Sequence, residues 1–121
     1  MRRHNFKNLQ IWQESMELIH QTYEMTSLFP EDEKYGLKSQ MNRCAVSIAS
    51  NIAEGTSKRT NKHFIKYLED SLGSAYEWET QLIICSRQNY LSNLKFSEME
   101  LQIIQLQKKI SRFIDTVESQ S

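Results

Sequence analysis

The sequence predicts an all-α fold, an antiparallel up-down-up-down four-helix bundle, and three observations lead to it. Apolar residues recur at spacings of three and four along most of the chain, the period of an amphipathic helix. Only three Gly and one Pro occur in 121 residues, which argues against a turn-rich β architecture. The helical stretches are joined by short polar connections, which place successive helices antiparallel. We expect a single domain, residues 1–121.

The first predicted helix covers about residues 6–27, and Pro30 ends it because the residue before a proline is pushed out of the α region. One apolar stripe has ordinary helical spacing and consists of Leu9, Trp12, Met16, Ile19 and Tyr23. A second stripe, Ile11, Leu18 and Met25, has a spacing of seven, which suits a neighbouring helix at a shallow crossing angle. Two stripes predict two neighbours, one of which another subunit can supply.

The second predicted helix, residues 31–54, carries more apolar surface than a surface helix normally buries. Its apolar arc covers about half the circumference and consists of Leu37, Met41, Cys44, Ala45, Ile48, Ala49, Ile52 and Ala53. Glu31, Asp32 and Glu33 are expected in its first turn, where negative charge suits the exposed amides. Gly55 is expected to end it in the left-handed conformation. Self-association then follows from apolar surface that one copy cannot cover.

The third predicted helix, residues 61–88, begins at a cap supplied by Thr60 or Asn61. Its inward face is predicted to be Phe64, Leu68, Ser71, Ala75, Trp78, Leu82 and Cys85. Gly73 costs roughly 1 kcal/mol relative to alanine in mid-helix, so we expect either a close helix approach or a kink there.

The fourth predicted helix, residues 97–118, begins with Ser97 and Glu100 in a capping box. Its inward face is predicted to be Met99, Ile103, Leu106, Ile110, Phe113 and Val117.

A narrow polar stripe runs beside the apolar arc of the second helix and consists of Gln40, Arg43, Ser47, Asn51 and Glu54. It has two interpretations, a ligand site or a hydrogen-bonded seam at a helix or subunit junction. We favour the seam, with Arg43 paired to an acid such as Glu54 or Glu77, because a buried guanidinium needs such a partner.

Four stretches of the chain resemble the four-helix-bundle protein family known from intervening sequences of bacterial 23S ribosomal RNA genes. They read FKNLQIWQ (6–13), FPEDEKYGL (29–37), QMNRCAVSIASNIAEG (40–55) and GSAYEWE (73–79). The chain departs from the family where two adjacent basic residues are common, since it has Asn42-Arg43, and Cys44 stands where alanine is usual.

The resemblance implies a bundle that assembles into a ring-shaped homo-oligomer, with a homopentamer the usual form. Some relatives are accessory subunits of reverse transcriptases in diversity-generating retroelements and bind nucleic acid, whereas others have no assigned role.

A cluster of cations begins the third helix and consists of Lys58, Arg59, Lys62, His63 and Lys66. Together with Arg2, Arg3 and Lys7, it is expected to bind phosphates of RNA or DNA with little sequence preference. The alternative is a solvated surface, because fifteen basic and fifteen acidic residues cancel overall. A ring would turn the weak cluster into a basic rim with avidity.

Catalytic and metal-binding motifs are missing, so we expect a non-enzymatic protein with no cofactor. A di-iron bundle needs two Glu-x-x-His pairs, and only Glu17 with His20 fits. No apolar run is long enough to span a membrane, and two cysteines in helices suit reduced thiols in the cytoplasm. The leading hypothesis is a ring that binds nucleic acid as an accessory to a nucleic-acid enzyme such as a reverse transcriptase. The alternative is a protein–protein interaction scaffold that ignores nucleic acid.

Overall fold

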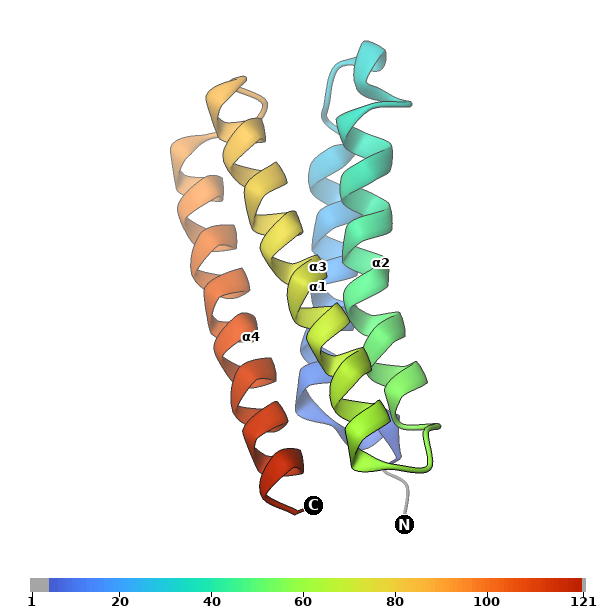
Figure 1. Cartoon of the computed structure of the whole chain (residues 1–121). Helices are drawn as coiled ribbons and strands as arrows, with labels where there is room; N and C mark the ends of the chain where they lie inside the picture. Colours follow the sequence, from blue (N-terminus) through green and yellow to red (C-terminus); the bar gives the residue numbers. More distant parts are fainter. Residues whose placement is uncertain (1–4, 121) are drawn as a thin grey trace.

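The computed structural model describes residues 5–120, and within that range the chain is all-helical with no strand, as predicted. The four helices are α1 (Gln10–Thr26), α2 (Leu37–Gly55), α3 (Asn61–Arg87) and α4 (Asn93–Ser119). They lie side by side, and each runs opposite to the one before it (Figure 1). The start of α1, the α2–α3 connection and the end of α4 therefore share one end of the bundle.

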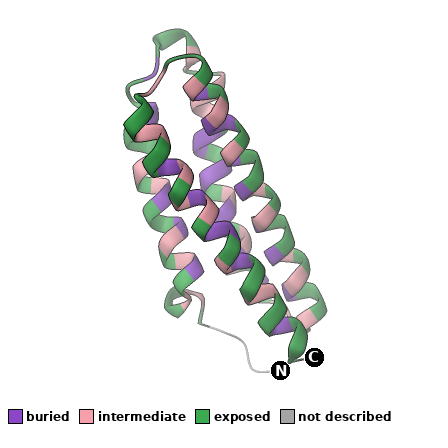
Figure 2. Cartoon of the chain, turned by 90° about the vertical axis from the view of Figure 1, so that its left-hand side faces the viewer, coloured by how far each residue is buried: buried purple, intermediate pink, exposed green. Residues whose placement is uncertain are grey.

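The helices pack in chain order around one core. The most extensive contacts are those of α2 with α3, followed by α3 with α4 and α1 with α2, whereas α1 and α4 meet only thinly. Buried residues line the facing sides of the helices (Figure 2). The largest fully buried side chains are Phe64, Trp78, Leu18, Met41, Ile48, Ile52, Leu68, Leu82, Met99, Ile103, Leu106 and Ile110.

The expectation that one copy cannot cover the apolar surface of the first two helices is wrong for the seven-spaced stripe of α1 and for the alanine-rich side of α2. Ile11, Leu18 and Met25 are buried within the single chain, and so are Ala45 and Ala49 of α2. A shallow crossing against neighbouring helices of the same chain accounts for that spacing. The other stripe of α1 remains partly outside, with Met16 43% and Tyr23 50% exposed.

The prediction that Glu31, Asp32 and Glu33 form the first turn of the second helix is wrong. Glu31–Glu33 form a separate 3-10 helix, and α2 begins only at Leu37. Glu33 caps α2 from outside, because its Oε1 accepts a hydrogen bond from the Leu37 amide at 3.2 Å. Its Oε2 accepts one from the Tyr90 hydroxyl at 2.7 Å, which raises the pKa of Tyr90 to about 12. One carboxylate thus joins the α1–α2 and α3–α4 connections.

Gly55 does not take the left-handed conformation predicted for it, since no described glycine has a positive φ. It is instead the last residue of α2 and is buried. A Cβ placed there would lie 2.9 Å from Cδ1 of the buried Phe64 and 3.0 Å from Cβ of Tyr67. Close approach of α2 to α3, rather than a helix-ending turn, therefore requires glycine here.

The connection between α3 and α4 is shorter than predicted, and the capping box at Ser97 and Glu100 is wrong. Asn89 has the left-handed φ of 61°, and the amide of Tyr90 donates to the Cys85 carbonyl at 2.9 Å. This pattern is a Schellman motif with asparagine in place of glycine. Ser92 then caps α4 by accepting from the Lys95 amide at 3.1 Å, so the helix starts four residues earlier than predicted.

At the start of α3, the predicted cap is confirmed, because Thr60 accepts a hydrogen bond from the His63 amide.

Gly73 has no close neighbour, so a close helix approach within the chain does not explain it. It is exposed, and nothing lies within 4 Å of a Cβ added there. The two glycines of the bundle's long helices thus occupy opposite environments.

The same substitution at these two positions is expected to have opposite effects. Gly55→Ala should lower the free energy of unfolding by about 1–3 kcal/mol, because the new methyl group must displace Phe64 or the backbone of α3. Gly73→Ala should raise it by up to about 1 kcal/mol, because alanine favours the helix and meets nothing. Urea denaturation of both variants checks this, and a destabilising Gly73→Ala would contradict it.

Candidate functional site

Five of the cations predicted to bind phosphate gather at the end of the bundle where α1 begins. We define the basic end as Lys7, Lys58, Arg59, Lys62 and Lys66. Lys7 lies in the 3-10 helix Phe6–Asn8, which contacts α2, while Lys58 and Arg59 lie in the α2–α3 connection. Lys62 and Lys66 follow in the first turns of α3. Arg2 and Arg3 lie outside the described residues.

Aromatic rings lie among these cations. The ammonium groups of Lys58 and Lys66 lie 4.7 Å and 5.1 Å from the centre of the Tyr67 ring, within cation–π range. The ammonium group of Lys7 lies 6.0 Å from the Phe6 ring, which packs edge-on against Trp12. Sequence reasoning did not single out Tyr67, although its position directly after Lys66 was a signal.

Acids lie beside part of the basic end and reduce its field. Asp70 pairs with Lys66 at 3.5 Å, although both side chains are more than half exposed. Glu69 and Glu118 line a surface pocket of about 470 Å³ together with Lys62 and His63. Among the described residues of the basic end, Lys66 is the one with an ion pair to an acid. The other four cations of the basic end, Lys7, Lys58, Arg59 and Lys62, have no ion pair within residues 5–120, although Lys62 lies near Glu69 and Glu118.

The polar stripe of α2 lies against α3, where part of it is hydrogen-bonded. The Asn51 amide donates to Ser47 Oγ at 3.1 Å, and the Ser47 and Ser74 hydroxyls lie 3.0 Å apart. The Arg43 guanidinium donates to Ser39 Oγ at 3.2 Å, and no described ion pair joins it to Glu54 or Glu77. Gln40, Arg43 and Glu54 are exposed, so solvent takes the place of the acid that a buried arginine would need.

A cavity of about 320 Å³ opens at this junction of α2 and α3, lined by Gln40, Arg43, Cys44, Ser47, Glu77 and Gln81. Cys44 donates to the Ser74 carbonyl at 3.0 Å and lies 3.4 Å from Glu77 Oε1. Burial raises the pKa of the Cys44 thiol to about 12, and Glu77 acts in the same direction. Burial, followed by the charge of Glu33, likewise raises the pKa of Cys85 to about 12. Both thiols are therefore protonated at neutral pH and poor nucleophiles.

His20, the histidine of the Glu-x-x-His pair, does not lie in a group of described side chains that could bind a metal ion. His20 Nε2 lies 3.0 Å from Glu24 Oε1 on the surface of α1. In residues 5–120, no three His, Cys, Asp or Glu side chains come close enough together to hold a metal ion.

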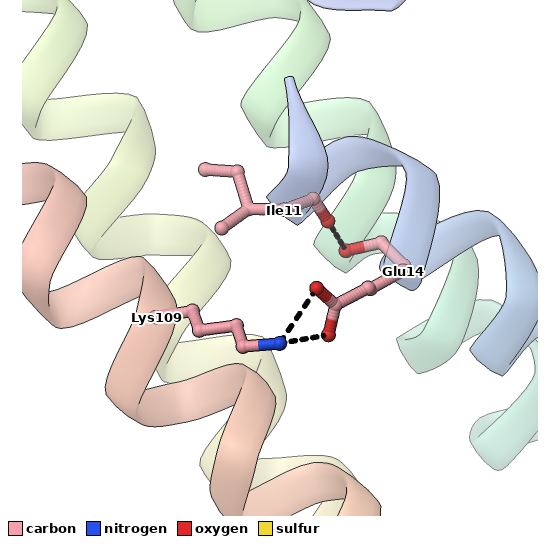
Figure 3. Close-up of polar contacts among 4 residues, drawn as sticks. Ile11, Glu14 and Lys109 are labelled. Atoms are coloured by element: carbon pink, nitrogen blue, oxygen red, sulfur yellow. Dashed lines mark hydrogen bonds and ion pairs between the residues drawn. The ribbon is translucent and has the colours of Figure 1, made fainter. Parts of the chain in front are cut away.

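The thin α1–α4 side is joined by an ion pair that sequence reasoning missed. Lys109 Nζ lies 2.9 Å and 3.0 Å from the two carboxylate oxygens of Glu14, and the two side chains point toward one another across the gap (Figure 3). Both are about one-third exposed, so the pair contributes at most about 1 kcal/mol. Spacing within one helix cannot reveal this contact, because its partners are 95 residues apart.

Two opposite sides of the bundle expose apolar surface. The α1–α2 side has a groove of about 330 Å³, lined by Trp12, Met16, Ile19, Val46, Ala49, Ser50 and Ala53. On the α3–α4 side, Tyr76 is 56% exposed and Ile104 is partly exposed, in a pocket whose other lining residues are Gln107, Lys108, Ser111 and Arg112. Leu101, 60% exposed, lies three residues before Ile104 on α4. No described helix is long and apolar enough to cross a membrane.

Comparisons with known proteins agree with this fold. A crystal structure of a protein of unknown function from the S23 ribosomal protein family of Bacteroides thetaiotaomicron superposes with a TM-score of 0.79 at 22% identity. The alignment covers 86% of this chain and 97% of that one, and at this identity it shows the fold alone. No curated protein matches the sequence. The pattern that defines the 23S rRNA-intervening sequence proteins matches residues 7–112. The chain therefore belongs to the 23S rRNA-intervening sequence protein family.

Proposed function

We propose that the protein is a non-enzymatic, homo-oligomeric bundle that binds nucleic acid without sequence preference through its basic end. The observation that carries the proposal is the gathering of cations from three separate parts of the chain at one end. Lys58, Arg59 and Lys62 have no acid partner among the described residues, so their charge is available to phosphates. Lysine ammonium groups act as point charges and do not read base edges, hence the lack of sequence preference.

Assembly into a ring, with five copies as the family resemblance implies, would make this binding effective. One copy offers few phosphate contacts, whereas a ring presents one basic end from every copy to the same strand. The apolar groove between α1 and α2, and the exposed Tyr76 of α3 and Leu101 of α4, support such assembly. Since the α1–α2 and α3–α4 sides share no helix, a contact between these sides of two copies is head-to-tail, and such contacts generate a ring when they close.

The partner we propose is a nucleic-acid enzyme such as a reverse transcriptase, to which the ring is an accessory. Two buried free thiols suit a reducing, cytoplasmic setting.

A protein–protein interaction scaffold is the second candidate, favoured by the apolar groove between α1 and α2. A groove with Met16 43% and Val46 38% exposed fits an apolar side chain of another protein as well as one of a second copy. The scaffold requires no affinity for nucleic acid, so the titration below separates the two candidates.

Replacing Lys58, Arg59, Lys62 and Lys66 by Gln together should weaken binding of mixed-sequence RNA or DNA. Affinity falls as salt rises, and each lost phosphate contact should make the slope of log affinity against log salt shallower by about 0.7 for a single strand. Fluorescence anisotropy at low and moderate salt measures both quantities.

The matched control removes three lysines and one arginine from the opposite end, by changing Lys34, Lys38, Arg87 and Lys95 to Gln. It should leave the affinity nearly unchanged. Equal losses in both variants, or no salt-dependent binding by the unmodified protein, would refute the proposed function.

The head-to-tail contact predicts a specific result from mixing two variants. Met16→Glu and Leu101→Glu each place a charge on one apolar side, and because both positions are exposed each chain should stay folded. Each variant alone should be a monomer by sedimentation, whereas an equal mixture should form a 1:1 dimer through its two intact sides. Leu28→Glu, at a position 82% exposed in the α1–α2 connection, controls for added charge. Two variants that assemble like the unmodified chain would exclude this contact.

A further inference from the structure

The surroundings of Tyr67 suggest which kind of nucleic acid the basic end receives, an inference that rests on the function proposed above. Tyr67 lies on α3 and is partly exposed. Its Cβ is held against the end of α2, where it would lie 3.0 Å from a Cβ at Gly55. Packing therefore fixes the Cβ of Tyr67, while its ring lies beside Lys58 and Lys66 of the basic end.

Two ammonium groups of like charge are held near this one ring. Lys58 lies 4.7 Å and Lys66 5.1 Å from the ring centre. The negative face of the ring attracts both cations, and Asp70 also pairs with Lys66 at 3.5 Å. A phosphate is a better partner than a ring for an ammonium group, because it forms charge-assisted hydrogen bonds. Lysine stems are flexible, so both groups can turn from the ring to phosphates.

When the two ammonium groups turn from the Tyr67 ring to the phosphates of a strand, they uncover a face of the ring. The bases of that strand then lie beside this face. Aromatic rings interleaved with cations are the usual platform for single strands, because any base can stack on them. A duplex keeps its bases stacked on one another and offers Tyr67 only phosphates. Phosphate contacts alone would not distinguish the two forms.

We propose that the ligand of the basic end is single-stranded nucleic acid, with one base stacked on Tyr67. Lys58 and Lys66 hold the phosphates on either side of that base, and Lys62 and Arg59 extend the contact along the strand. The expected preference is for unpaired over paired nucleic acid, with tolerance of sequence.

The test compares one short mixed-sequence RNA, alone and annealed to its complement, by anisotropy with the full chain. Tyr67→Leu should weaken binding of the single strand by about fivefold or more, the effect of losing one stacked base. Its effect on the duplex should be clearly smaller. Tyr67→Phe keeps the ring and should bind both forms nearly as the unmodified protein does. Thermal melting of Tyr67→Leu and Tyr67→Phe checks that both variants remain folded.

Tyr35→Leu is the matched control, because Lys34 lies 5.5 Å from the Tyr35 ring at the other end of the bundle. It should change neither affinity. Equal losses on single strand and duplex, or no loss from Tyr67→Leu, would overturn the stacking role while leaving phosphate binding by the basic end intact. Absence of salt-dependent binding by the unmodified protein would instead overturn the proposed function itself.

Discussion

The packing of α2 between α1 and α3 is the constraint on which the rest of the structure depends. The buried arc of α2 is wide, because it extends from Cys44 (5% exposed) through Ala45 and Ile48 to Ala49 (4% exposed), and no single neighbouring helix can cover it. Each buried isoleucine contributes roughly 1.5–3 kcal/mol, and Gly55 lets the end of α2 approach α3 closely enough to continue this packing. The antiparallel course of the helices places the α2–α3 connection at the end where α1 begins, and Lys58 and Arg59 in this connection have no ion pair within residues 5–120.

The helices and their inward faces could be predicted because burial repeats with the helical period. Phe64, Trp78 and Ile103 were assigned to the core from spacing alone, and all are fully buried. Helix ends were less predictable, because several residues can satisfy the same free amides. Ser92 and Ser97 both suit a cap, and only the turn fixed by Asn89 selects the first. Likewise a glycine such as Gly55 suits both a left-handed turn and a close approach, and periodicity cannot tell them apart.

The candidate site was predictable in composition but not in its contacts. Consecutive cations at Lys58 and Arg59 are visible in the sequence, whereas the role proposed for Tyr67 depends on two lysine ammonium groups that lie near its ring. Leu18 and its stripe belong to the core and are not available for self-association. What supports assembly is the outer stripe of α1 around Met16, whose exposure depends on where α2 lies. Contacts between distant segments, such as Glu14 with Lys109, leave no periodic signal.

The central claim is that one chain already encloses its own core, so that the fold does not depend on assembly. The most direct test measures mass by sedimentation and helical content by circular dichroism on the same dilution series. The account predicts that any assembly dissociates into single chains whose helical content is unchanged. Loss of helix in step with dissociation would contradict it, because folding would then depend on the neighbouring copies.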